Sequence, residues 1–280
     1  ARDAQGRIVV DSTRFPSGIK ALADYVHSKG LQFGIYSDAG FKTCQGRPGS
    51  FGFEELDAAT YQEWGVDYLK YDWCAHRLKR AENVYPRMGE ALAALDRDIV
   101  YSICNWGWGN PWEWAPEIGH LWRTTWDIEP EFNKKGHIIY RNVLEILDKN
   151  ERLAAYAGPG AWNDPDMLEV GNNNAWTYAQ NRAHFTLWAM MAAPLMAGND
   201  LRNMNDTILS ILTHPGVIAI NQDPLGVQGF RIGQEGPIEI WLKPLQDGEK
   251  AICFFNRSEE VVEISLKLAQ RLTLNQGYSI

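Results

Sequence analysis

Residues 66–74 read Val-Asp-Tyr-Leu-Lys-Tyr-Asp-Trp-Cys, an apolar stretch of strand length that carries two opposite charges near its end. Side chains alternate along a strand, so Lys70 and Asp72 are expected to share one face. A lysine beside a carboxylate favours the ionised carboxylate, which is the state that a carboxylate nucleophile needs. The segment therefore predicts a strand that ends in a reactive acid, and the alternative is a salt bridge that only stabilises the strand end.

Similar apolar runs, each followed by polar residues or glycine, alternate with helical patterns on both sides of this segment. The expected strands are 31–37, 66–72, 98–104, 120–127, 160–164 and 193–198, and the expected helices are 15–29, 53–64, 84–97, 137–150 and 174–192. This alternation is typical of parallel βαβ units and predicts an α/β fold, a (β/α)8 TIM barrel. The strands would be the third to the eighth, so we expect an N-terminally truncated barrel. An open doubly wound sheet is the alternative.

The pattern changes at about residue 226. Alternating strands are expected at 229–233, 238–245, 251–256 and 261–268. Asp247-Gly248, between two of these runs, is a strong hairpin signal. The sequence therefore predicts a barrel portion over residues 1–225 and the start of a C-terminal antiparallel β-sandwich domain, itself truncated, over residues 226–280.

Composition excludes several classes of partner. The chain has 280 residues, enough to bury a sizeable core, and a formal net charge of −8. It contains no run of lysine or arginine that would follow a nucleic acid backbone, and no apolar stretch near the roughly 20 residues of a membrane helix. The four cysteines lack the C-x-x-C spacing of a zinc site. We therefore expect no nucleic acid partner, no membrane span, no metal and no cofactor.

Polar residues gather where the expected strands end, which is where a barrel carries its active site. These residues are Tyr36, Asp38, Lys70, Asp72, Cys104, Asn105, Arg123, Asp127, Trp162, Asp164, Asp166, Asn199 and Asp200. The interiors of the strands are apolar, so solubility does not explain this grouping. The pattern favours a functional site over an isolated salt bridge.

Several carboxylates without a metal or nucleotide signature indicate acid–base and nucleophilic chemistry on a neutral, hydroxyl-rich ligand. A glycosidase needs two carboxyl groups, one protonated to assist the leaving oxygen and one ionised to meet the developing positive charge. Asp72 suits the ionised role because Lys70 shares its face. The spacing leaves its partner open among Asp38, Asp127, Asp164 and Asp166.

Five long segments resemble the successive signatures of a known family. They are DYLKYDWC (67–74), LWRTTWDI (121–128), AGPGAWNDPDMLEVGN (157–172), LWAMMAAPLMAGNDLR (187–202) and VIAINQDPLGVQG (217–229). In this order they are similar to the α-galactosidase and α-N-acetylgalactosaminidase family, glycoside hydrolase family 27 of clan D. The resemblance runs through nearly the whole predicted barrel portion.

The resemblance implies a role for individual residues. It makes Asp72 the nucleophile and Asp127 the general acid and then base of a retaining mechanism. It implies sugar contacts by Tyr36, Lys70, Arg123, Asp166 and Met167, together with Asn105 near the sugar C2 position. It also implies a disulfide between Cys44 and Cys74.

The resemblance predicts an exo-glycosidase that releases terminal α-linked galactose from a galactoside or related glycan, in a secreted, periplasmic or lysosome-like compartment. Many α-galactosidases carry glutamate where this chain has Asn105, so α-N-acetylgalactosaminidase and β-L-arabinopyranosidase are alternatives within the family. A carbohydrate-binding barrel without catalysis is the alternative from another class. The family's first two strands would precede Ala1, so we expect the isolated chain to be inactive, with exposed sheet edges.

Overall fold

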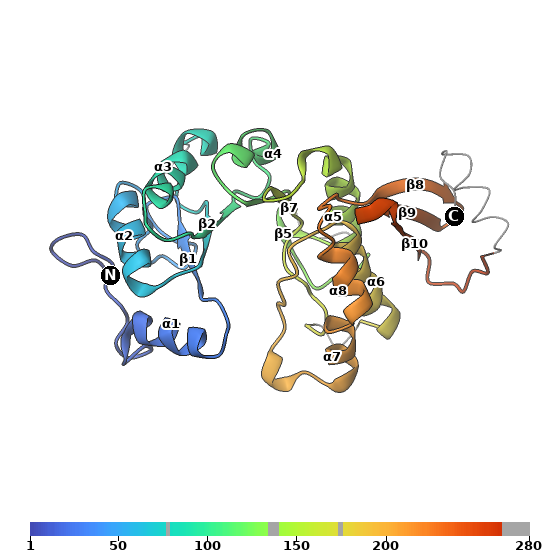
Figure 1. Cartoon of the computed structure of the whole chain (residues 1–280), viewed down its shortest axis with the longest axis horizontal. Coiled ribbons are helices and arrows are strands. Elements are labelled where there is room, and N and C mark those ends of the chain that lie inside the picture. The colour runs from blue at the N-terminus through green and yellow to red at the C-terminus, as the bar shows by residue number, and fades with distance from the viewer. Residues whose placement is uncertain (77–78, 134–139, 173–175, 265–280) are drawn as a thin grey trace. The chain divides into compact units, whose positions relative to one another are not determined.

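The computed structural model describes residues 1–76, 79–133, 140–172 and 176–264, and the chain folds as two compact units, residues 1–124 and 125–280 (Figure 1). The first unit is built on the parallel strands β1 (Gly34–Asp38), β2 (Tyr68–Asp72), β3 (Val100–Cys104) and β4 (Leu121–Arg123), which are neighbours in this order. The register pairs Asp38 with Asp72, and Asp72 with Cys104. The carboxyl ends of these three strands therefore lie side by side.

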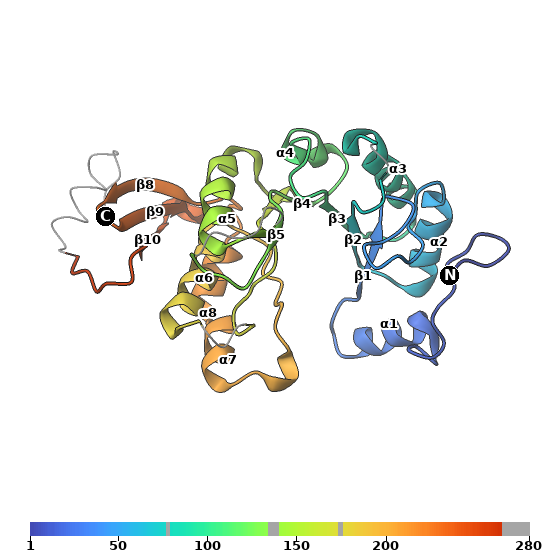
Figure 2. The same ribbon diagram turned by 180° about the vertical axis from the view of Figure 1, so that it is seen from behind.

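Helices connect the strands of the first unit as the βαβ pattern predicts. The helices are α1 (Gly18–Ser28), α2 (Glu54–Trp64), α3 (Ala81–Ala93) and the short α4 (Pro111–Trp114), which a 3-10 turn over Ala115–Glu117 follows. Helix α1 contacts α2, and α2 contacts α3, so the three form a row (Figures 1 and 2). Helix α2 ends at Trp64. Gly65 caps it with a left-handed backbone (φ 75°), donates its N–H to the carbonyl of Gln62 and leads into β2.

The core of the first unit decides which face of β2 carries the polar residues. Leu69, Tyr71 and Trp73 are at most 1% exposed. The rings of Tyr71 and Trp73 pack against Tyr85 of α3, with centroids 5.7 and 5.4 Å apart. Because side chains alternate along the strand, burial of these residues against α3 leaves Lys70 and Asp72 on the opposite face.

The second unit begins with the short parallel strands β5 (Asp127–Ile128) and β6 (Tyr140–Arg141). It continues with α5 (Val143–Asn150), a 3-10 turn (Glu151–Tyr156), β7 (Trp162–Asp164), α6 (Tyr178–Met190), a second 3-10 turn (Leu201–Asn203), α7 (Asp206–Leu212) and α8 (Pro215–Asn221). Capping boxes begin both α5 and α6, at Asn142 and Thr177. Buried side chains such as Trp188 of α6 and Leu147 of α5 form its core.

An antiparallel sheet follows, as the change of pattern predicts. Its strands β8 (Phe230–Glu235), β9 (Ile238–Pro244) and β10 (Lys250–Asn256) lie in the order β10-β9-β8. The connection between β9 and β10 contains the 3-10 turn Gln246–Gly248, in which Asp247 has φ 60°. Of the expected strand 261–268, residues 261–264 are not a strand and residues 265–268 lie outside the described residues.

Two predicted strands are wrong. The stretch 120–127 is not one strand, because the chain leaves the sheet after Arg123 and Asp127 starts a separate pair with Tyr140. The stretch 193–198 forms only an isolated bridge, from Ala197 to Leu168. Pro194 has no N–H to donate to a ladder, and this loss explains why an apolar run fails to form a strand.

Several predicted ends also move. The helix expected at 84–97 is Ala81–Ala93, and the helices expected from 137 and 174 begin at Val143 and Tyr178, where their caps lie. Residues 137–139 and 174–175 fall outside the described residues. Within the part of the chain that the structure describes, none of the helices combines the length and the apolar character that a membrane crossing requires.

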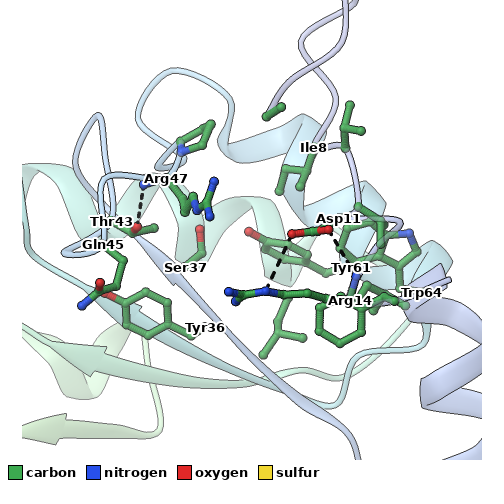
Figure 3. A pocket seen from close by; sticks show the side chains of 17 residues that line it. Ile8, Asp11, Arg14, Tyr36, Ser37, Thr43, Gln45, Arg47, Tyr61 and Trp64 are labelled. Carbon is green, nitrogen blue, oxygen red and sulfur yellow. Dashed lines mark hydrogen bonds and ion pairs between the residues drawn. The ribbon is translucent and has the colours of Figure 1, made fainter.

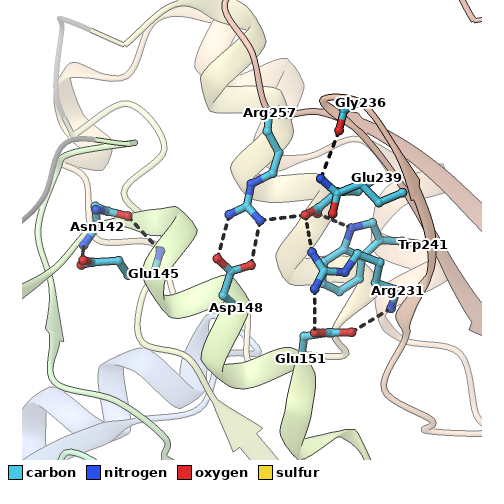
Figure 4. A network of polar contacts seen from close by, with 10 residues as sticks. Asn142, Glu145, Asp148, Glu151, Arg231, Gly236, Glu239, Trp241 and Arg257 are labelled. Atoms are coloured by element: carbon cyan, nitrogen blue, oxygen red, sulfur yellow. Dashed lines mark hydrogen bonds and ion pairs between the residues drawn. The ribbon is translucent and has the colours of Figure 1, made fainter.

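A buried carboxylate organises the junction between the antiparallel sheet and α5 (Figure 4). Glu239 of β9 is 0% exposed and accepts hydrogen bonds from Arg231 (2.5 Å), Arg257 (2.7 Å) and the indole of Trp241 (3.0 Å). Arg257 also binds both carboxylate oxygens of Asp148 in α5, at 2.8 and 2.9 Å. Glu239 is therefore an acid that both arginines share and that water does not reach.

We expect Glu239→Gln to lower the free energy of unfolding by roughly 3 kcal/mol, because it removes one partner of a buried ion pair and leaves two guanidinium groups facing a neutral amide. The matched control is Asp24→Asn, which removes an exposed ion pair with Lys20 in α1. Urea denaturation of both variants checks the prediction. Equal stability of Glu239→Gln and the parent protein would contradict it.

Candidate active site

Asp72 ends β2 and is held by two hydrogen bonds. The hydroxyl of Tyr36 donates to Asp72 Oδ2 at 2.8 Å, and the backbone N–H of Trp73 donates to Oδ1 at 2.9 Å. The residue is 7% exposed. A carboxylate oxygen accepts more than one hydrogen bond, so both oxygens keep a lone pair for a further interaction. The structure thus presents a fixed, largely buried carboxylate at a strand end.

Tyr36 of β1 keeps its proton and serves as the donor in this contact. Burial raises the pKa of its hydroxyl well above the usual value, and the nearby charge of Asp72 raises it further. The register pairs Tyr36 with Lys70, so the tyrosine, the lysine and Asp72 come from one strand pair. The effect of Lys70 on the ionisation of Asp72 stays a prediction.

The disulfide between Cys44 and Cys74 is present, as the resemblance implies, with the Cα atoms 5.2 Å apart. Cys44 Sγ lies 3.4 Å from both Tyr36 Oη and Asp72 Oδ2. Potential ligand atoms of Asp38, Cys44, Asp72 and Cys74 all lie within 4.8 Å of one another. The sulfurs are bonded to each other and are not thiolates, so this cluster offers a metal two carboxylates and not four ligands.

Asp38 ends β1 and is 0% exposed. Its oxygens accept the backbone N–H groups of Gly40 (2.7 Å) and Cys74 (2.9 Å). Burial raises the pKa of the Asp38 carboxyl to about 7, and the two backbone donors offset this only in part. Both oxygens of Asp38 accept backbone N–H groups, so we do not assign Asp38 as the catalytic partner of Asp72 among the acids that were left open.

Asn105 follows β3 and Arg123 is the last residue of β4, and they are 0% and 1% exposed. Asn105 Nδ2 donates to the carbonyl of Trp108 at 2.5 Å, whereas its Oδ1 has no hydrogen-bond partner among the described residues. A buried acceptor without a donor costs about 1–3 kcal/mol, and a ligand hydroxyl would satisfy it. Arg123 Nη1 lies 3.7 Å from Cys104 Sγ.

In the second unit, Asp166 contacts the backbone of Ile128, the residue that follows Asp127. Asp166 Oδ2 accepts the N–H of Ile128 at 2.8 Å, and Oδ1 accepts the N–H of Met167 at 2.7 Å. Asp166 has φ 86°, a strained conformation for a residue other than glycine, and Asp164 stabilises it by accepting its N–H at 2.8 Å. Asp164 therefore acts as a turn residue here.

The expected site residues form two groups. The first unit brings together Tyr36, Asp72 and the disulfide, and the second brings together Asp127, Asp166 and Met167. The catalytic and binding roles of these residues are part of the proposal below. The sequence pattern did not reveal the contact of Asp38 with both loops, although an aspartate two residues before a glycine is a common signal for a side chain that bonds its own loop.

The first unit also has a pocket of about 390 Å³ beside Tyr36 (Figure 3). Residues of the first twenty, the loop after β1, and Tyr61 and Trp64 of α2 line it, and most of these side chains are apolar. Of the expected sugar contacts in the described chain, Tyr36 alone lines this pocket. We therefore place the candidate catalytic site at the strand ends, where Asp72 lies, and not in this pocket.

Comparison with known proteins agrees with this arrangement. Residues 1–223 match the family model "alpha galactosidase A", and residues 235–280 match the model of the alpha galactosidase C-terminal beta sandwich domain. The chain is 54% identical to alpha-galactosidase A of Cellvibrio japonicus over 94% of the present chain. It is 48% identical to alpha-galactosidase of Cyamopsis tetragonoloba over 100% of the present chain. A solved alpha-galactosidase from Saccharomyces cerevisiae is similar with a TM-score of 0.88 and 34% identity, over 91% of this chain and 63% of that one.

The chain spans 65% and 66% of the length of the two curated relatives, just under two thirds. The parallel strands of this chain are consistent with a TIM barrel, and the antiparallel sheet that follows them lies where the model of the C-terminal beta sandwich domain matches. The fold is therefore the predicted barrel portion with a C-terminal antiparallel β domain. On the strength of the family model and these relatives, the chain belongs to the alpha-galactosidase family of glycoside hydrolases.

Proposed function

We propose that the protein in its natural length is a retaining exo-glycosidase that hydrolyses terminal α-linked galactose from oligosaccharides or glycoconjugates. The observation that carries the proposal is the carboxylate of Asp72, which Tyr36 and the backbone of Trp73 hold at a strand end. Family membership and the names of the relatives support the sugar, and the yeast neighbour was solved with raffinose.

The first half of the reaction forms a covalent intermediate. One oxygen of Asp72 attacks the anomeric carbon, and the bond from that carbon to the leaving oxygen breaks. Asp127 gives its proton to the leaving oxygen, so the aglycone departs as a neutral alcohol. The hydrogen bonds to Asp72 fix the geometry of attack before the substrate arrives, which is the contribution of positioning to the rate.

The second half releases the sugar. Asp127, now ionised, takes a proton from water while the water oxygen attacks the anomeric carbon, and the ester bond to Asp72 breaks. Galactose leaves with the configuration of the substrate, and both carboxyl groups return to their first state. Two displacements at one carbon explain the retention.

We assign the remaining expected residues to binding of the galactosyl group. Arg123 and Lys70 contribute hydrogen-bond donors, the hydroxyl oxygen of Tyr36 and the carboxylate of Asp166 contribute acceptors, and Met167 contributes an apolar surface. Asn105 Oδ1 supports a contact with a sugar hydroxyl, because it is a buried acceptor that lacks a donor within the described chain. The disulfide supports a secreted, periplasmic or lysosome-like compartment.

A panel of nitrophenyl glycosides tests the substrate. We expect the highest kcat/KM on the α-galactoside, above the α-N-acetylgalactosaminide and the β-L-arabinopyranoside, since the two curated relatives compared above are named alpha-galactosidases. A higher value on either of the other two sugars would move the assignment to that activity. Binding of galactose without turnover of any glycoside would instead favour a carbohydrate-binding barrel.

We expect Asp72→Gly to abolish turnover, because it removes the attacking oxygen. Azide should restore part of the rate on an activated aryl galactoside and give β-galactosyl azide, the product of a single inverting displacement in the vacated space. Product analysis by NMR checks the configuration. An α-configured azide would show that Asp72 is the acid/base residue and not the nucleophile.

We expect Asp127→Ala to lower kcat/KM on natural oligosaccharides by roughly 100-fold or more, while dinitrophenyl galactoside suffers far less in its first step, because a good leaving group needs little protonation. Burst kinetics on the dinitrophenyl substrate, followed beside hydrolysis of the oligosaccharide, separates the two effects. Equal losses on both substrates would remove Asp127 from the acid role.

A further inference from the structure

The structure assigns to Asp38 a role that goes beyond the proposed chemistry. We infer that Asp38 is a positioning residue for Asp72, because its buried carboxylate joins the loop after β1 to the loop after β2 and so fixes the backbone that holds the nucleophile. The inference rests on the proposed function in one respect, which is that Asp72 is the nucleophile. Asp38 itself touches neither substrate nor reacting atoms.

The two oxygens of Asp38 bind different loops. Oδ1 accepts the N–H of Gly40, two residues further along its own chain, whereas Oδ2 accepts the N–H of Cys74, which follows β2. The second contact joins residues 36 positions apart in the sequence. One carboxylate therefore fixes the spacing between two strand-end loops.

The backbones of these loops touch directly. Ala39 N–H donates to the carbonyl of Asp72 at 2.9 Å, and Ser50 N–H donates to the carbonyl of Asp38 at 2.8 Å. A Cβ atom on Gly40 would lie 1.9 Å from the carbonyl oxygen of Cys74, so only glycine permits this approach. The backbones of the two loops are therefore in close contact at Gly40 and Cys74.

A shift of Cys74 would reach Asp72 by two routes. Trp73, whose N–H binds Asp72 Oδ1, immediately precedes Cys74 in the chain. The disulfide connects Cys74 to Cys44, whose sulfur lies 3.4 Å from both Asp72 Oδ2 and Tyr36 Oη. Asp38 thus acts on both oxygens of Asp72 indirectly, through the N–H of Trp73 and through the disulfide, and does not itself touch the substrate.

Stability alone does not explain an acid at this position. A buried carboxylate is costly unless it is paired, and within the part of the chain that the structure describes no cation forms an ion pair with Asp38. Its two hydrogen bonds offset this cost only in part, since burial still raises the pKa of the group. A carboxylate is short and has two acceptor oxygens, so it accepts backbone N–H groups from two loops at once. This bridge between the loops is the contribution of Asp38 to the site.

The test uses Asp38→Asn, which keeps the size of the side chain but places an amide donor against one of the two backbone donors. The matched control is Asp67→Asn, the same change in an acid that also accepts a backbone N–H, from Phe33 at 2.7 Å, just before the opposite end of β2. In the protein of natural length, kcat and KM are measured on an aryl α-galactoside. The protein is then treated with a fluorinated galactosyl fluoride, and intact mass and peptide mapping give the rate at which Asp72 is labelled.

We expect Asp38→Asn to lower kcat and the labelling rate by roughly 10- to 100-fold with little change in KM, because a misplaced nucleophile loses rate and not affinity. Asp67→Asn should lower stability and leave both rates within about twofold of the parent. If Asp38→Asn does not fold, Asp38→Ser replaces it, since a hydroxyl still accepts from Gly40 but is too short to reach Cys74.

Parent-like rates in the folded Asp38 variant would overturn the inference. Losses in both aspartate variants that follow their losses of stability would also overturn it, because they would show a structural role alone. If the parent protein is labelled at a residue other than Asp72, the proposed mechanism fails first and this inference fails with it. A label on Asp72 that forms at the same rate in the Asp38 variant refutes the inference alone.

Discussion

The parallel register of β1, β2 and β3 is the constraint on which the rest of the site depends. It pairs Asp38 with Asp72, and Asp72 with Cys104, so three strand ends and the loops that follow them converge. Tyr36 lies two residues before Asp38 on the same face of β1, and its hydroxyl therefore reaches Asp72. A shift of one residue would turn each of these side chains to the other face and replace the acid with apolar residues.

Burial of apolar side chains in the core offsets the free-energy cost of burying polar groups at the site. Leu69, Tyr71 and Trp73 bury one face of β2, and each contributes roughly 2 kcal/mol or more by leaving water. That gain compensates for the carboxylates of Asp38 and Asp72, which lie nearly out of solvent. In the second unit, packing of the helices likewise compensates for the strained backbone of Asp166. The N–H of Asp166 binds Asp164, and its carboxylate accepts the N–H of Ile128.

Local pattern predicted much of this arrangement and failed where the chain departs from regular ladders. The strand at 66–72, its polar face and the antiparallel sheet follow from alternation, and the disulfide followed from the family resemblance. The strand at 193–198 failed because Pro194 overrides an apolar run, and the strand at 120–127 failed because Asp127 pairs with Tyr140 instead. The role of Asp38 was out of reach because it depends on the backbone of Cys74, a contact between distant segments that no local pattern encodes.

The central claim is a double displacement that begins with attack by Asp72, and the stereochemistry of the first product tests it most directly. Proton NMR during hydrolysis of an aryl α-galactoside, at an enzyme concentration that outpaces mutarotation, reads the anomeric signal of galactose as it forms. The account predicts that α-galactose appears first and that β-galactose grows in later by mutarotation. Initial release of β-galactose would mean a single displacement by water, and it would contradict the account.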